Sequence, residues 1–185
     1  FTPETKNTPE LVNNLLVLGG SLGAQKINET IANIKTPLNI WHQTGVKHLE
    51  SVKLAYKNNP NTNLCIEPFI ENMAEAYAWA DVVVCRAGAM TVSELVATKT
   101  IAILVPFPYA VDNHQTKNAQ FLSDHGAGIL LEESLLNTEA LDMQLRSLNT
   151  NKLKDMTSAL ESLQIVCPEK TIVDYILIPN RSKSS

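Results

Sequence analysis

The chain has 185 residues, of which 44% are hydrophobic and 18% are charged, and this composition suffices for the core of one ordinary globular domain. Its formal net charge of -4 argues against a general nucleic-acid-binding protein, because such proteins carry a basic surface. The sequence contains no run of about 18 apolar residues and no charged-then-apolar leader, so we expect no membrane-spanning segment.

Segments with strand-like and helix-like patterns alternate along the chain. The strand candidates are residues 14–18, 39–42, 63–67, 82–85, 101–105 and 128–131. The helix candidates are residues 25–33, 46–57, 73–79, 91–98, 114–125, 138–148, 152–163 and 168–177. This alternation predicts an α/β fold, namely a Rossmann-like parallel six-stranded sheet in the order 3-2-1-4-5-6 with helices on both faces. Ligands of such sheets bind at the carboxyl ends of the strands where the strand order reverses.

A glycine-rich turn, residues 19–24, follows the first strand and opens a helix. It departs from the dinucleotide fingerprint, and His42 and Gln43 stand where an acidic residue is expected, so we do not predict NAD. The turn is suited to an anion, because free N–H groups at a helix start attract negative charge. Tight packing of the turn without any ligand is the alternative.

A second turn of this kind, residues 86–94, follows the buried strand 82–85 and has Gly88 at its bend. Its main chain is suited to phosphate for the same reason. Thr91 and Glu94 have the spacing of a capping box, which requires no ligand. Alternatively, Glu94 accepts hydrogen bonds from two sugar hydroxyls, one helical turn away from the phosphates.

A proline-rich loop, residues 106–111, leaves the fifth strand at its carboxyl end. Asp112 and Gln115 after it again fit a helix cap with a third-position glutamine. Gln115 and Asn118 share one helix face, and their amides are suited to the hydroxyls of a sugar. A solvated helix start is the alternative.

The sequence offers no catalytic or metal-binding pattern. We find no Ser/His/Asp order, no zinc-protease helix motif and no carboxylate pair with acid and base spacing, although we expect His42 and His114 near the cleft. Three cysteines without metal-ligand spacing predict buried, reduced thiols, as in a reducing cytosol: Cys65, Cys85 and Cys167. Residues with helical or simple apolar spacing are assigned to the core: Trp41, Met73, Ala76, Tyr77, Trp79 and Ala80.

Five segments, taken together and in this order, resemble the C-terminal, donor-binding domain of the MurG family. They are residues 19–24, 41–45, 78–86, 88–94 and 114–119, and the likeness covers nearly the whole chain. MurG proteins are bacterial transferases that add N-acetylglucosamine to the lipid-linked muramyl-pentapeptide precursor of peptidoglycan, converting lipid I to lipid II. They are inverting GT-B glycosyltransferases, built from two Rossmann-like halves, of which the C-terminal half holds UDP-N-acetylglucosamine.

The resemblance implies a role for each matching residue. Glu94 would accept hydrogen bonds from the ribose hydroxyls, and the backbone of Ile70 would contact uracil. The diphosphate would be lined by Ser21, Ala89, Met90 and Thr91. The N-acetylglucosamine would be held by Gln115 with His114 and Asn118 near it, although the family often carries glutamine at the position of His114. No catalytic residue, metal or cofactor is implied in this part of the enzyme.

The resemblance also implies a domain organisation. Residues 1–13 would be an interdomain linker remnant, residues 14–178 the UDP-sugar-binding domain, and residues 179–185 a disordered tail. The family's N-terminal half, with its glycine-rich loop and histidine, has no counterpart in the sequence, so the chain looks like half an enzyme that is inactive alone. The lipid-linked acceptor would bind through that other half, in a cytoplasmic protein held peripherally on the inner face of the inner membrane.

Two alternatives stay open at this point. The chain could be a stand-alone UDP-N-acetylglucosamine-binding subunit that needs a membrane partner. It could also belong to another GT-B transferase or to a UDP-sugar 2-epimerase, because these enzymes share the fold.

Overall fold

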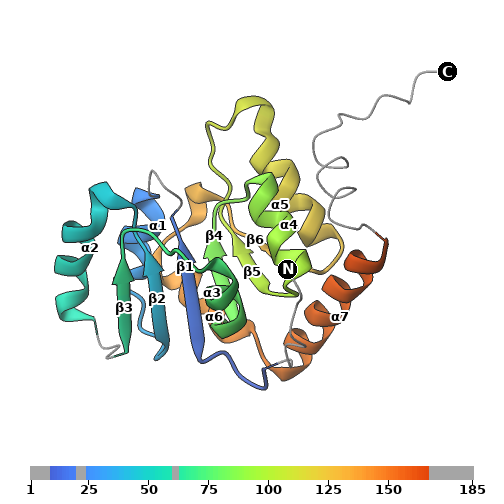
Figure 1. The fold of residues 1–185 in the computed structure, drawn as a ribbon, viewed down its shortest axis with the longest axis horizontal. Helices are drawn as coiled ribbons and strands as arrows, with labels where there is room; N and C mark the ends of the chain where they lie inside the picture. Colours follow the sequence, from blue (N-terminus) through green and yellow to red (C-terminus); the bar gives the residue numbers. More distant parts are fainter. Residues whose placement is uncertain (1–8, 20–23, 60–62, 167–185) are drawn as a thin grey trace.

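The computed structural model describes residues 9–19, 24–59 and 63–166. In this part of the chain the strands form a six-stranded sheet with the order β3-β2-β1-β4-β5-β6, and all neighbouring strands are parallel (Figure 1). The strands are β1 (Asn14–Leu18), β2 (Asn39–Gln43), β3 (Leu64–Glu67), β4 (Val82–Cys85), β5 (Ile101–Leu104) and β6 (Ile129–Leu130). The predicted fold class and strand order are confirmed.

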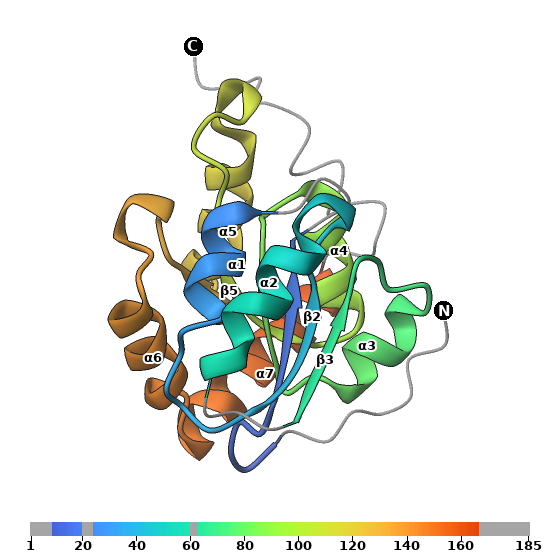
Figure 2. The ribbon, with the colours of Figure 1, turned by 90° about the vertical axis from the view of Figure 1, so that its left-hand side faces the viewer.

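Helices connect the strands and cover both faces of the sheet. The α-helices are α1 (Gln25–Ile31), α2 (Leu49–Ala55), α3 (Met73–Trp79), α4 (Ala89–Ala97), α5 (His114–Asp124), α6 (Thr138–Ser147) and α7 (Thr150–Val166). Short 3-10 helices are η1 (Val46–His48), η2 (Tyr56–Asn58), η3 (Val111–Asn113) and η4 (Glu133–Leu135). α1 contacts α2 and α6, whereas α4 contacts α5 and α7. Figure 2 shows α6 and α3 on opposite sides of the sheet.

The core is centred on β1 and β4, because these strands have a neighbour on each side and helices on both faces. The sequence is accordingly apolar without alternation along both strands, and Leu15 to Leu18 and Val82 to Cys85 are buried. β1 pairs with β2 on one side and with β4 on the other. Leu18 lies in register with Cys85, so the turns that follow these two residues leave the sheet side by side. This is the point where the strand order reverses.

The starts of two helices differ from the prediction. α4 begins at Ala89, two residues earlier than expected, because the extended residue Gly88 takes the cap position and makes no side-chain bond. Thr91 is therefore inside the first turn, and the capping box of Thr91 with Glu94 is wrong. The cap of Asp112 with Gln115 is also wrong, since Asn113 precedes α5 in a left-handed conformation, φ 56°, without a side-chain cap bond.

The structure corrects two further residues. Cys65 is exposed rather than buried, because β3 is the edge strand of the described sheet, whereas Cys85 in the central strand β4 is buried as expected. His42 is buried in the core beside β1 and does not face a cleft. Several predictions lie outside the described residues, namely the site residue Ser21, Cys167, the helix at residues 168–177 and the tail at residues 179–185.

Candidate functional site

The end of β1 is packed too closely for any side chain on Gly19. A Cβ there would lie 3.0 Å from the main-chain oxygen of Gln43 and 3.1 Å from the nitrogen of Ala24. The Gly19 N–H itself donates to that Gln43 oxygen over 3.1 Å. Packing therefore favours glycine at this position, which supports the ligand-free alternative for this one residue.

A buried polar network lies directly beneath this turn. His42 Nε2 lies 2.9 Å from Asn28 Oδ1, and His42 Nδ1 lies 2.9 Å from the Tyr56 hydroxyl. Asn28 Nδ2 donates to the Thr44 oxygen over 3.0 Å, so Asn28 Oδ1 is an acceptor and His42 must carry its proton on Nε2. The Tyr56 hydroxyl then donates to Nδ1. Burial lowers the pKa of His42 to about 3, so this ring is a neutral structural group near pH 7.

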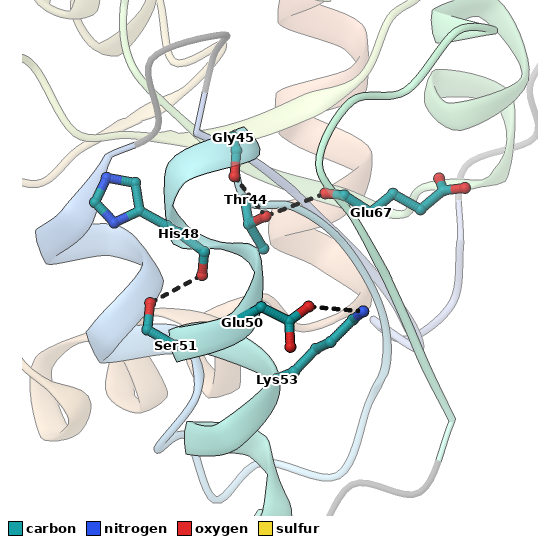
Figure 3. A network of polar contacts seen from close by, with 7 residues as sticks. All are labelled: Thr44, Gly45, His48, Glu50, Ser51, Lys53 and Glu67. Carbon is teal, nitrogen blue, oxygen red and sulfur yellow. Dashed lines mark hydrogen bonds and ion pairs between the residues drawn. The ribbon is translucent and has the colours of Figure 1, made fainter.

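The turn after β2 is fastened to the end of β3 (Figure 3). The Thr44 hydroxyl lies within hydrogen-bond distance of the main-chain oxygens of Gly45 and Glu67, at 3.0 Å and 3.3 Å, and Figure 3 shows it between them. Gly45 has a φ of 77°, which side chains rarely adopt, and its N–H donates to the Pro68 oxygen. These bonds fix the carboxyl ends of β2 and β3 relative to each other.

The first turn of α4 has main-chain N–H groups that the helix itself leaves unbonded. Val92 N–H returns to the Gly88 oxygen over 3.0 Å, whereas the N–H groups of the three residues before it, Ala89, Met90 and Thr91, have no acceptor within the helix. Among the described residues, a Cβ on Gly88 would meet only the Thr91 hydroxyl, at 3.7 Å, and Met90 is 69% exposed. An anion can therefore approach this helix start from solvent.

Glu94 follows one turn later and lies half-buried between α3 and α4. Its Oε2 accepts a hydrogen bond of 2.8 Å from the hydroxyl of Tyr77, a residue of α3 that is 1% exposed. Burial, with the nearby Glu94 as a further cause, raises the pKa of the Cys85 thiol to about 12. The Cys85 thiol therefore stays protonated and has no nucleophilic character.

Ile70 lies in the loop from β3 to α3 and is buried. The residue as a whole is 2% exposed, so Ile70 packs in the core, and the contact of its main chain with uracil stays a prediction of the resemblance. The adjacent Phe69 is 56% exposed and is the apolar side chain that the loop offers to solvent. Asn72 ends the loop and caps α3, with its Oδ1 accepting from the Glu75 N–H over 3.3 Å.

The two amides of α5 that sequence reasoning selected make different contacts. Gln115 Oε1 accepts a hydrogen bond from the Phe107 N–H over 2.9 Å, so its NH2 group is the end that a ligand can use. Asn118 is buried, and its Nδ2 donates to the Ala87 oxygen over 2.8 Å. His114 is half-buried, and its Nε2 lies 3.8 Å from the Asp112 carboxylate.

Sequence reasoning gave Arg86 no role, but the structure places it at the centre of the loop contacts. Its Nη1 donates to the main-chain oxygens of Val105 and Pro106, both at 3.2 Å, and it forms an ion pair with Glu133. Its guanidinium also lies 5.3 Å from the centroid of the Phe107 ring. Arg86 thus pins the loop after β5 to the end of β4.

Arg86 also lines a pocket of about 550 Å³ at this edge of the sheet. The other residues that line it come from the start of α1, the loop after β5, α5 and η4: Ala24, Gln25, Lys26, Glu29, Phe107, Gln115 and Glu133. Among the described site residues that the sequence predicts, Gln115 lines this pocket, and the pocket lining does not include the others: Ile70, Ala89, Met90, Thr91, Glu94, His114 and Asn118. The pocket combines an aromatic ring with amides and charges of both signs.

The described ranges offer neither a membrane span nor a metal cluster. No helix among residues 9–19, 24–59 and 63–166 is long and apolar enough to cross a lipid bilayer. In the same ranges no three His, Cys, Asp or Glu side chains gather closely enough to hold a metal ion.

Comparison with known proteins gives a family match over most of the chain. Residues 14–171 match the family described as the glycosyltransferase family 28 C-terminal domain. The chain is 49% identical, over 96% of its length, to the UDP-N-acetylglucosamine--N-acetylmuramyl-(pentapeptide) pyrophosphoryl-undecaprenol N-acetylglucosamine transferase of Vesicomyosocius okutanii, of which it covers 51%. It is 44% identical to the transferase of the same name from Acinetobacter baylyi, with 88% of the chain and 46% of that protein covered.

Solved structures agree with this match. The crystal structure of MurG from Acinetobacter baumannii superposes with a TM-score of 0.76 at 36% identity, covering 95% of this chain and 53% of that one. The glycosyltransferase VinC, at 17% identity and a TM-score of 0.63, shares the fold alone. The chain therefore spans about half the length of the relatives that it matches.

Proposed function

The chain belongs to the glycosyltransferase family 28 C-terminal domain family, and on this premise we propose that it binds UDP-N-acetylglucosamine as the donor half of an inverting transferase. The acceptor would be the lipid-linked muramyl-pentapeptide, and the product would be the disaccharide precursor of peptidoglycan. This assignment takes the activity named for the relatives of Vesicomyosocius okutanii and Acinetobacter baylyi and transfers it to this chain.

The observation that carries the proposal is the open first turn of α4 beside Gly88. Its main-chain N–H groups and the helix dipole would stabilise the charge that grows on the β-phosphate as UDP leaves. The acceptor hydroxyl on C4 would attack C1 of the sugar from the opposite side, forming the new glycosidic bond as the bond to UDP breaks. This electrostatic role raises the rate because it is stronger in the transition state than in the bound donor.

The remaining donor contacts are proposed from the roles that the family resemblance implies. The Glu94 carboxylate would accept hydrogen bonds from the ribose hydroxyls, and the main chain of Ile70 would contact uracil. The Gln115 NH2 group would donate to a hydroxyl of the N-acetylglucosamine, because its oxygen is engaged by the Phe107 N–H. Acceptor binding, the catalytic base and attachment to the cytoplasmic face of the inner membrane would come from a second half.

Calorimetry of the chain with UDP-N-acetylglucosamine tests the proposal. We expect binding at up to millimolar concentration, and we expect Glu94→Ala to weaken it about tenfold or more, since a charge-assisted hydrogen bond pair is lost. Glu139→Ala, which removes an exposed carboxylate on α6, is the matched control and should bind as the wild type does. Absence of binding at millimolar donor would refute the proposal, and conversion of the donor into another UDP-sugar without acceptor would indicate an epimerase instead.

A further inference from the structure

Tyr77 carries a hydroxyl that its position in the core does not require. It lies on α3, is 1% exposed, and packs in the apolar core with Ala76 and Ala80, where phenylalanine would fill the same space. Buried tyrosines keep their hydroxyl where it has a polar partner. The partner identified here is Glu94 Oε2 on the neighbouring helix α4, at 2.8 Å.

The direction of this hydrogen bond is fixed. Burial, the nearby Cys85 and Glu94 all raise the pKa of the Tyr77 phenol, so it stays protonated and donates to the carboxylate. The bond occupies one lone pair of Oε2 and leaves Oε1 and the remaining lone pairs of Glu94 for further donors. Two vicinal hydroxyls are donors that such a carboxylate can accept together.

The bond also links two parts of the site. α3 begins directly after the loop that carries Ile70, and Asn72 caps its first turn. A carboxylate held from α3 is therefore positioned relative to that loop as well as to α4. A half-exposed glutamate without such a bond would have to lose its side-chain freedom when a ligand binds.

We propose that Tyr77 is a positioning residue that holds Glu94 ready for the 2′- and 3′-hydroxyls of the nucleotide ribose. This inference rests on the proposed function, because it takes Glu94 as the ribose contact. It adds that selection of ribonucleotides over 2′-deoxyribonucleotides is set by a residue that does not touch the ligand.

The experiment compares UDP and 2′-deoxy-UDP by calorimetry with the wild type and with Tyr77→Phe. The wild type should prefer UDP. Tyr77→Phe should bind UDP about three- to tenfold more weakly, with a smaller loss for 2′-deoxy-UDP, so the ratio of the two dissociation constants should fall toward one. The ratio reports on the folded molecules alone, because reversible partial unfolding raises both apparent dissociation constants by the same factor and leaves their ratio unchanged.

Tyr56→Phe is the matched control, since it removes the hydroxyl of another buried tyrosine, the one beside His42, and should keep the wild-type ratio. In a Glu94→Gln background the effect of Tyr77→Phe on the ratio should disappear, because Tyr77 acts through that carboxylate.

A wild-type ratio in Tyr77→Phe would overturn the positioning role while leaving donor binding intact. A wild type that binds UDP and 2′-deoxy-UDP equally would overturn the ribose contact on which the role depends. A wild type that binds neither nucleotide would refute the proposed function itself.

Discussion

Asn118 Nδ2 donates a hydrogen bond to the main-chain oxygen of Ala87 over 2.8 Å, and this contact joins α5 to the turn between β4 and α4. Both residues are buried, at 3% and 0% exposure, so water cannot replace the bond. The helix that carries Gln115 is thereby fixed to the turn that opens α4. The proposed sugar and phosphate contacts therefore belong to one rigid unit of the fold.

We predict that Asn118→Leu destabilises the protein by about 1–3 kcal/mol, because the buried Ala87 oxygen loses its donor. Urea unfolding measures this cost. Asn33→Leu is the control, since Asn33 makes the same kind of amide bond to the Glu29 oxygen at 2.8 Å on an exposed helix end, and should cost less than about 0.5 kcal/mol. Equal losses in the two variants would show that the contact to Ala87 has no special importance.

Gly88 and Gly19 should respond differently to alanine. At Gly88, φ is -65° and, in the part of the chain that the structure describes, only the Thr91 hydroxyl lies within 4 Å of a new Cβ, so alanine should change the free energy of unfolding by less than about 0.5 kcal/mol. The methyl group would nevertheless stand where the diphosphate approaches the main chain, so donor affinity should fall about tenfold or more. Calorimetry together with urea unfolding separates the two effects.

Gly19→Ala provides the contrast. Its Cβ would lie 3.0 Å from the Gln43 oxygen and 3.1 Å from the Ala24 nitrogen, so the turn must shift at a cost of about 1–3 kcal/mol. A Gly88→Ala variant that binds UDP-N-acetylglucosamine as the wild type does would contradict the phosphate-binding role of α4.

The sheet could be predicted from the sequence because its signals are local. The apolar runs of β1 and β4 and the glycines after them mark buried parallel strands and their turns, and right-handed crossovers then leave few possible strand orders. The start of α4 was harder to predict, since Gly88 and Thr91 are both acceptable caps and only tertiary packing decides between them. The exposed Cys65 could not be predicted from an apolar pattern that central and edge strands share.

The candidate site could be predicted only in part. Residues that present the main chain, such as Met90, follow directly from a strand, a glycine and a helix start in sequence. Side-chain contacts between distant segments, such as the bonds of Arg86 to the loop after β5, leave no local pattern. Helical spacing placed Tyr77 in the core correctly, but spacing is the same for phenylalanine and gives no sign of the hydrogen bond to Glu94.

Gln115 should determine the preference for the sugar of the donor. Gln115→Glu keeps an acceptor for the Phe107 N–H, so the loop should stay in place, but the variant loses the NH2 donor. The added charge should weaken the binding of UDP slightly and that of UDP-N-acetylglucosamine more, so any preference for the sugar nucleotide over UDP should be lost, as measured by calorimetry. Gln120→Glu adds the same charge on the exposed side of α5 and should leave both affinities unchanged. A Gln115→Glu variant that retains the sugar preference would rule out this contact.

His42 should make the stability depend on pH in a defined direction. Its pKa is about 3 in the folded protein, against an ordinary value of 6.5, so between these values the unfolded chain binds the proton and the folded protein does not. The free energy of unfolding is therefore highest above about pH 6.5 and falls by roughly 1.4 kcal/mol per pH unit as the pH drops further. Burial alone would raise the pKa of Asp142, but hydrogen bonds from Thr36 and Lys35 and the nearby Arg146 together lower it from 3.8, so Asp142 affects the stability only below about pH 4.

Urea unfolding between about pH 4.5 and 7.5 checks this dependence against His42→Gln, in which the side chain cannot titrate. The variant should be less stable near pH 7, where the network of Asn28, His42 and Tyr56 is intact in the wild type. Its stability should fall less steeply toward the acid end of this range, so the two curves converge as the pH drops. Tyr56→Phe keeps the imidazole and should retain most of the wild-type slope. Parallel curves for the wild type and His42→Gln would mean that folding does not lower the pKa of His42, which would contradict the assignment of a buried, neutral ring.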